Sequence, residues 1–220
     1  MINAKSFIKP LTWLFFSVSF LDIIGVILQD SWLQLIFKPL IMPSLILLYV
    51  VRVKSRNYWY VAAMFFSFLG DVLLLDKNNM FLYGIAAFLI TQLLYVLIIA
   101  KDLPRSDFKT KALALLPFLF FFTGLISILK DGLGEFLIPV IIYGLAISIF
   151  GFVSLLNYLL KKDRASLTLL IGAILFILSD SMIALHKFYE PQAIYPSAIM
   201  ITYIAAQFLI FGYMIKQSEK

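Results

Sequence analysis

Long apolar runs alternate with short polar segments along the whole 220-residue chain. Each run holds about the 20 residues that an α-helix needs to cross the hydrocarbon core of a bilayer. A backbone exposed to lipid must satisfy its own hydrogen bonds, which favours helices, and the runs lack the alternation of a membrane β-barrel. The pattern therefore predicts an all-α, polytopic membrane protein with eight spans, at about 11–28, 33–51, 58–75, 80–99, 111–129, 136–159, 167–185 and 194–215.

The connections between the runs are short, so we expect one integral membrane domain over residues 1–220. Lys5 and Lys9 precede the first run, as basic residues precede the apolar core of a secretory signal. This run is longer than such a core, and the segment 29–32 after it offers no small-residue cleavage site. We therefore expect the first run to remain as a span.

The composition excludes several classes of function. Charged residues make up 14% of the chain, compared with about 25% in soluble domains, and 63% of its residues are hydrophobic. The net charge of +6 comes from short basic clusters between apolar runs, which is typical of membrane orientation and not of a nucleic-acid interface. The chain has no cysteine and one histidine, which excludes thiolate and three-histidine metal sites. We expect no metal and no cofactor.

Lysine and arginine residues are distributed asymmetrically between the two sides. Of the 18, fourteen lie at the two termini and in every second connection, whereas Lys77, Lys130 and Lys187 lie on the opposite side. By the positive-inside rule both termini are cytoplasmic, and this alternation independently indicates an even number of spans. We expect a multi-pass protein of a bacterial inner membrane.

Three ionisable residues lie deep inside apolar runs. An ionisable side chain at the bilayer centre costs about 2.5–3.5 kcal/mol, so each is a candidate for function. Asp71 and Asp180 each lie 13 residues beyond the start of a run, and Lys38 lies five residues into a run of opposite direction. At 1.5 Å per residue, all three lie roughly 20 Å above the cytoplasmic edge. We expect them to share one depth in the outer half of the bilayer.

A weak internal repeat relates the two halves of the chain. The segment 69–71 matches 178–180, and 91–94 matches 206–209, with four spans between the members of each pair. This spacing predicts two parallel four-helix repeats related by an axis along the membrane normal. Such an axis would make Asp71 and Asp180 face each other.

The same polar residues also have structural interpretations. A buried aspartate is often an interhelical hydrogen-bonding residue, and this applies above all to Asp22 in the first span. Lys38 can extend its ammonium to the outer interface. Interhelical hydrogen bonds are equally open to Gln92, Gln207, Tyr95, Tyr143 and Tyr203.

Two carboxyl groups close together at low dielectric cannot both ionise easily, so one becomes a proton donor and its partner a base. That arrangement suits acid–base hydrolysis without a metal. Intramembrane aspartyl proteases use such a pair, but their second motif is Gly-x-Gly-Asp. Phe68 stands where the first glycine of that motif would be, which argues against a protease.

Five segments carry a more specific pattern: Lys38-Pro39-Leu40, Gly70-Asp71, Tyr83-Gly84-Ile85-Ala86-Ala87-Phe88, Ser179-Asp180-Ser181 and Thr202-Tyr203-Ile204-Ala205-Ala206-Gln207. In this order, and over most of the chain, they resemble the lysoplasmalogenase (YhhN-like) family of multipass membrane proteins. The chain departs from the pattern of that family in the fourth span, where Gln92 replaces a histidine. Glutamine can form hydrogen bonds but cannot carry a proton, which argues against a proton relay at this position.

The resemblance implies hydrolysis of the vinyl ether bond of lysoplasmalogens to a fatty aldehyde and a glycerophospho-alcohol. We expect a lysophospholipid substrate, contacts with membrane lipids and no nucleic acid. The expected acid and base are Asp71 and Asp180. The expected substrate-binding residues are Lys38, toward the lipid phosphate, with Tyr95, Tyr143, Ser179, Tyr203 and Gln207. A transporter or proton-coupled carrier is the main alternative, because it also uses membrane aspartates, and a purely structural membrane protein is a third.

Overall fold

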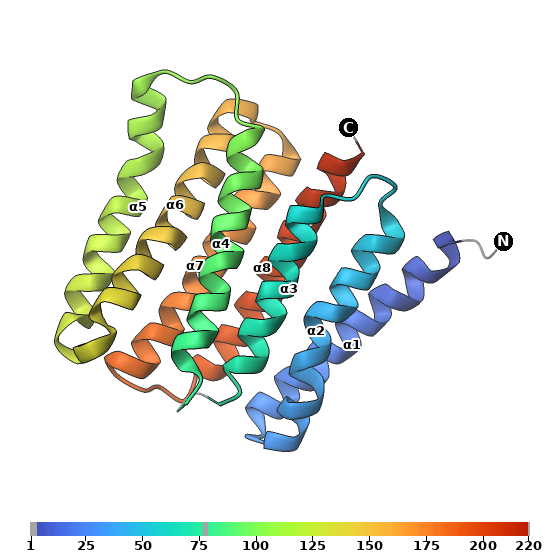
Figure 1. Ribbon diagram of the computed structural model, residues 1–220, viewed down its shortest axis with the longest axis horizontal. Helices are drawn as coiled ribbons and strands as arrows, with labels where there is room; N and C mark the ends of the chain where they lie inside the picture. Colours follow the sequence, from blue (N-terminus) through green and yellow to red (C-terminus); the bar gives the residue numbers. More distant parts are fainter. Residues whose placement is uncertain (1–3, 77–78, 220) are drawn as a thin grey trace. The chain divides into compact units, whose positions relative to one another are not determined.

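The computed structural model describes residues 4–76 and 79–219, so Lys77 and Lys220 lie outside the described residues. Within these ranges the chain is helical and contains no strand, which confirms the all-α class. Short 3-10 turns cover Ala4–Phe7, Lys130–Gly132 and Gly134–Phe136. The α-helices are α1 Ile8–Ile27, α2 Ser31–Arg52, α3 Tyr58–Leu73, α4 Phe81–Lys101, α5 Phe108–Leu129, α6 Leu137–Lys161, α7 Arg164–Phe188 and α8 Tyr195–Ser218 (Figure 1).

Among the described residues, seven of these helices are long and apolar enough to cross a membrane. The exception is α3, which has 16 residues and therefore rises about 24 Å, less than the roughly 30 Å of a hydrocarbon core. The polytopic class is confirmed: each predicted span corresponds to one apolar helix, and α3 is shorter than the other seven. Compared with the predicted runs, most helices are longer at one or both ends by one to three residues, because the helix continues into residues outside the apolar segment.

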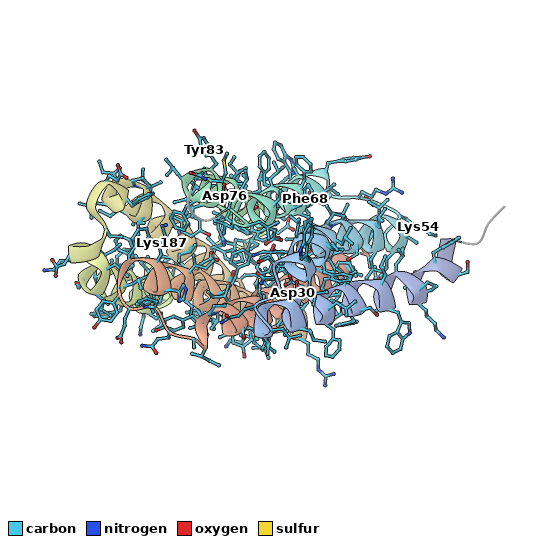
Figure 2. The ribbon with its side chains drawn as sticks, turned by 90° about the horizontal axis from the view of Figure 1, so that it is seen from below. Asp30, Lys54, Phe68, Asp76, Tyr83 and Lys187 are labelled. Atoms are coloured by element: carbon cyan, nitrogen blue, oxygen red, sulfur yellow. The ribbon has the colours of Figure 1, made fainter. Side chains whose placement is uncertain are left out.

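Polar side chains at the ends of the apolar runs explain where several helices begin. The Asp30 carboxylate accepts hydrogen bonds from the backbone N–H groups of Trp32 and Leu33 at the start of α2. Asn57 caps α3 in the same way, and Asp163 forms a capping box at the start of α7. These caps satisfy N–H groups that the first helical turn leaves unpaired. Asp30 and Lys54 lie at opposite ends of α2 (Figure 2).

The chain divides into two compact units. The first comprises Met1–Thr91 with Phe211–Lys220, and the second comprises Gln92–Ile210. The boundary therefore falls inside α4 and inside α8, whereas the predicted repeat would divide the chain between α4 and α5. Each unit is described by itself below.

In the first unit, α1 and α2 form an antiparallel hairpin, and α2 packs against α3. The helices of the hairpin approach closely at Gly25, where a Cβ atom would lie 2.7 Å from the Leu33 Cβ and 3.2 Å from the Gln34 backbone nitrogen. The Gln34 amide donates to the Gly25 carbonyl oxygen at 3.3 Å. Glycine at this position thus sets the distance between the two helices.

At the other end of α2, a tyrosine joins three segments of the first unit. The Tyr49 hydroxyl forms a 3.1 Å hydrogen bond with the Ser218 hydroxyl and accepts one from the Asn57 backbone N–H at 3.2 Å. Its ring packs edge-on against Tyr60, with centroids 4.8 Å apart. The end of α8 is therefore held at the connection between α2 and α3.

In the second unit, α6 packs between α5 and α7. Phe118 of α5, Ile147 of α6 and Ile177 of α7 form one buried cluster. A Cβ atom on Gly151 would overlap the Phe118 ring, so this glycine makes room for an aromatic side chain from the neighbouring helix. The packing leaves α6 as the central element of this unit.

Gly25→Ala should lower the thermal unfolding temperature of the detergent-solubilised protein, because the added methyl group overpacks the α1–α2 contact at a cost of about 1–3 kcal/mol. Gly124→Ala in α5 is the matched control, because no atom lies within 4 Å of the position that its added methyl group would occupy. The control should leave stability unchanged or raise it by about 0.5–1 kcal/mol, since alanine favours helix. Equal melting curves for the two variants would contradict the close approach at Gly25.

Candidate functional site

An aromatic framework crosses the second unit and positions its polar groups. Tyr95 of α4 packs on Phe150 of α6, with ring centroids 5.5 Å apart. Phe150 packs on Phe176 of α7 at 6.4 Å, and Phe176 packs on Tyr203 of α8 at 5.7 Å. All four rings are buried. Four helices are thereby held in register at the level of these rings.

Asp180 lies one helical turn beyond Phe176 on α7 and is 6% exposed. The Tyr143 hydroxyl of α6 donates a hydrogen bond to its Oδ2 atom at 2.5 Å. Distances of about 2.5–2.7 Å are typical of an O–H group that donates to an ionised carboxylate, the stronger class of hydrogen bond. The contact joins α6 to α7 and orients the carboxyl group.

Two further hydrogen bonds connect α8 to its neighbours within the same unit. The Tyr95 hydroxyl donates to Oε1 of Gln207 at 2.8 Å, and both side chains are fully buried. The Ser179 hydroxyl donates to the Ile199 carbonyl oxygen at 3.1 Å. Ser179 therefore joins α7 to α8 as a hydrogen-bond donor, and its oxygen can still accept a hydrogen bond.

Gln92 is one of the polar residues of this unit with unmet hydrogen-bonding capacity, as are Ser148 and Asn157 among the described residues. It lies one turn before Tyr95 on α4 and is fully buried, and neither its amide nitrogen nor its amide oxygen has a hydrogen-bond partner in the described part of the chain. The amide approaches the Tyr143 hydroxyl closely enough to interact with it, but without hydrogen-bond geometry. A buried amide without partners is costly, so this one is suited to bind a water molecule or a polar ligand atom.

Asp71 belongs to the first unit, on the buried face of α3, and is 3% exposed. Ser67, one turn earlier, donates to the Thr91 hydroxyl of α4 at 3.3 Å. Gly70, directly before Asp71, packs against the Phe88 ring, where a Cβ atom would lie only 2.6 Å from the ring carbons. Asp71 therefore lies at a close contact between α3 and α4. Gly70 leaves room for the Phe88 ring there, and Ser67 and Thr91 join the two helices by a hydrogen bond.

Lys38 of α2 is half-buried and lies within electrostatic reach of Asp22 on α1. Asp22 is completely buried, and both of its carboxyl oxygens lack a hydrogen-bond partner among the described residues. The interpretation of Asp22 as an interhelical hydrogen-bonding residue is therefore not supported. Sequence reasoning missed this feature, because hydropathy does not report whether a buried carboxyl finds a donor.

The predicted site residues thus fall into two groups. The second unit brings together Asp180 with Tyr143 and Gln207 with Tyr95, and adds Ser179 and Tyr203 on the same helices. The first unit holds Lys38 and Asp71. Within residues 4–76 and 79–219, no group of three or more histidine, aspartate or glutamate side chains is placed to hold a metal ion.

Comparisons with known proteins add the family context. The sequence model of the YhhN family matches residues 33–214, which leaves α1 outside the match. A protein of Bos taurus named Lysoplasmalogenase TMEM86A is 31% identical over 159 residues, which cover 66% of this chain and 60% of the relative. The chain therefore spans about three fifths of the length of this curated relative. No solved structure matches the chain.

The buried hydrogen bond between Tyr95 and Gln207 should be measurable as a coupling energy. In a double-mutant cycle of Tyr95→Phe and Gln207→Leu, the expected coupling is about 0.6–1.7 kcal/mol, the range found for interhelical hydrogen bonds in membranes. The measurement is the free energy of unfolding in mixed detergent micelles. Thr123→Val, which removes a hydroxyl that bonds only within α5, should show no coupling to Tyr95→Phe. Additive effects of the first pair would contradict the contact.

Proposed function

Because the chain belongs to the YhhN family, we propose that it is an intramembrane hydrolase that cleaves the vinyl ether bond of lysoplasmalogens. The named relative supports this activity class. The observation that carries the proposal is the hydrogen bond from Tyr143 to the buried Asp180, beside an amide, Gln92, that still needs a partner. Together they offer an oriented carboxyl group and a place for a water molecule inside an apolar protein.

The reaction needs one acid, one base and one water molecule. Protonation of the β-carbon of the vinyl ether converts it into an oxocarbenium ion. Water then adds to the adjacent carbon while a base takes its proton, which gives a hemiacetal. The hemiacetal then breaks its bond to the glycerol oxygen, which takes a proton from the group that acted as the base, while the hemiacetal hydroxyl returns a proton to the group that acted as the acid. The products are a fatty aldehyde and a glycerophospho-alcohol. A neutral carboxylic acid with a carboxylate beside it can supply both proton transfers without a metal.

We assign Asp180 the carboxylate role, because a phenol donates to it at a distance typical of an ionised acceptor. It would stabilise the positive charge of the oxocarbenium ion and accept the proton of the attacking water. Asp71 is then the acid that protonates the β-carbon. Gln92, and Tyr95 with Gln207, would orient the water molecule and the ether oxygen by hydrogen bonds.

A lysophospholipid can enter such a site sideways between helices and keep its single chain in the bilayer. The phosphate is then left near the outer interface, where the half-buried Lys38 is the proposed phosphate-binding residue. An ammonium group is a compact donor for a phosphate oxygen. In this proposal Lys38 binds the head group of the lipid, and Asp71 and Asp180 act on its vinyl ether bond.

Purified protein supplied with lysoplasmenylethanolamine should release free aldehyde, and a chelator should leave the rate unchanged. Asp71→Asn and Asp180→Asn should each lower kcat by about 10²–10⁴, the range of general acid–base catalysis. The double variant should be no slower than the slower single variant, because both residues act on formation of the oxocarbenium ion, Asp71 as the acid and Asp180 as its counter-charge. Asp131→Asn, at an exposed carboxyl group outside the site, is the control and should keep full activity.

An inactive wild-type protein that instead moves the substrate across proteoliposome membranes would overturn the hydrolase and favour the transporter. Full activity in either aspartate variant would contradict its catalytic role. Multiplied losses in the double variant would contradict a shared step.

For orientation, we propose cytoplasmic termini in a bacterial inner membrane. In the first unit, Arg52, Lys54 and Arg56 flank the α2–α3 connection, at which the end of α8 is held. In the second unit, seven basic residues flank the α4–α5 and α6–α7 connections: Lys101, Arg105, Lys109, Lys111, Lys161, Lys162 and Arg164. These are the connections that the positive-inside rule assigns to the cytoplasm.

The absence of native cysteine allows a direct test of this orientation. In spheroplasts, a membrane-impermeant maleimide should label Asp131→Cys, which lies between α5 and α6. It should label Glu219→Cys only after the membrane is permeabilised. The reverse labelling pattern would invert the proposed topology.

A further inference from the structure

The α1–α2 hairpin of the first unit contains a buried charged group that the proposed mechanism does not use. Asp22 is completely buried, and both of its carboxyl oxygens lack a hydrogen-bond partner in the described part of the chain. The Ser19 hydroxyl, about one turn earlier on the same face of α1, is also buried without a partner among those residues. Buried polar groups are normally hydrogen-bonded, so this carboxyl group needs another explanation.

The register of the hairpin places Lys38 opposite Asp22. Gly25 packs against Leu33 and Gln34, and in an antiparallel pair each step back along α1 is a step forward along α2. Asp22, three residues before Gly25, therefore meets α2 at about Ile36 and Phe37, next to Lys38, which lies one turn after Gln34 on the same face of α2. In agreement with this register, Lys38 lies within electrostatic reach of the Asp22 carboxyl group.

The two residues differ in their access to a ligand. Asp22 is enclosed between the helices, whereas the side chain of Lys38 is half-buried, so its ammonium group can reach a ligand without leaving the hairpin. Each charge alone would be costly at membrane depth, and opposite charges at short range offset part of that cost. The carboxyl group thus holds a positive charge in place beside the surface of the hairpin.

We propose that Asp22 is the positioning residue for Lys38, and that the pair forms a phosphate-binding element for a lysophospholipid head group. Asp22 does not contact the lipid. It holds the ammonium group in place beside the hairpin, and the phosphate becomes a second counter-ion of Lys38 on binding. The identity of the ligand as a lysophospholipid rests on the proposed function. The binding of a phosphate group by the pair does not depend on catalytic turnover.

The test measures binding to the full chain in detergent by calorimetry, with three probes. The first is an alkyl lysophosphoethanolamine, whose saturated ether cannot be cleaved as a vinyl ether is. The second is the matching alkylglycerol without phosphate, and the third is inorganic phosphate. The readout is the affinity ratio of the first probe to the second, which isolates the contribution of the phosphate.

Asp22→Asn and Lys38→Met should each lower this ratio by about tenfold, the lower end of what a hydrogen bond to a charged group contributes. The double variant should be no worse than Lys38→Met alone, because Asp22 acts through Lys38. Asp22→Glu should retain most of the ratio, and Ser19→Ala, the matched control on the same face, should leave it unchanged. Competition by inorganic phosphate would identify free phosphate as a second ligand of the same element, whereas no competition would assign it to the lipid head group.

Asp22→Leu separates positioning from a structural role. Replacing a buried carboxyl group with an apolar side chain should raise the unfolding temperature, while the affinity ratio should fall as it does in Asp22→Asn. An unchanged ratio in a folded Asp22→Leu protein would overturn the proposal, as would additive losses in the double variant. If binding follows the expected pattern but the wild type releases no aldehyde, the proposed hydrolase fails and the phosphate-binding element stands.

Discussion

A polar side chain on an apolar helix has no bulk water to bind, so a side chain that does not bond to the backbone of its own helix depends on a partner from another helix. This constraint governs the structure more than any single apolar contact, because lipid is as apolar as the helix faces and does not drive them together. In the second unit, Tyr95 of α4 finds Gln207 of α8, and Tyr143 of α6 finds Asp180 of α7. The aromatic contacts from Tyr95 to Tyr203 hold these helices at the level where the bonds form.

Close helix contacts are the second requirement, since short hydrogen bonds need helices that approach one another. Glycine allows this approach at Gly25 in the first unit and at Gly151 in the second, where a methyl group would meet a neighbouring side chain. At Gly70 the space is filled by the Phe88 ring, directly beside Asp71. The residues that carry the proposed chemistry are therefore supported by residues that carry none.

The groups without partners are as informative as the bonded ones. Gln92 and Asp22 are both completely buried and lack hydrogen-bond partners in the described residues. Gln92 lies beside the Tyr143–Asp180 bond, which suits it to hold a reactant. Asp22 lies opposite Lys38, which suits it to hold another side chain. Unmet hydrogen-bonding capacity thus supports two different roles, binding a reactant at Gln92 and positioning a side chain at Asp22. The neighbouring polar or charged residue distinguishes the two cases.

Hydropathy and motifs along the chain were enough to predict the helical class, the helix bounds to within about three residues and the family. Hydropathy reports the free energy of each segment in a bilayer, which is a local sum over neighbouring residues, and caps such as Asp30 are equally local. Hydropathy also identified Asp71, Asp180 and Lys38 as ionisable residues whose burial in the membrane is energetically unfavourable. The packing of the helices was needed to learn that Tyr143 bonds to Asp180, that Tyr95 bonds to Gln207, and that Asp22 bonds to no described residue. Those outcomes depend on the rotation of each helix about its axis and on side chains more than 30 residues apart, and no local pattern encodes that.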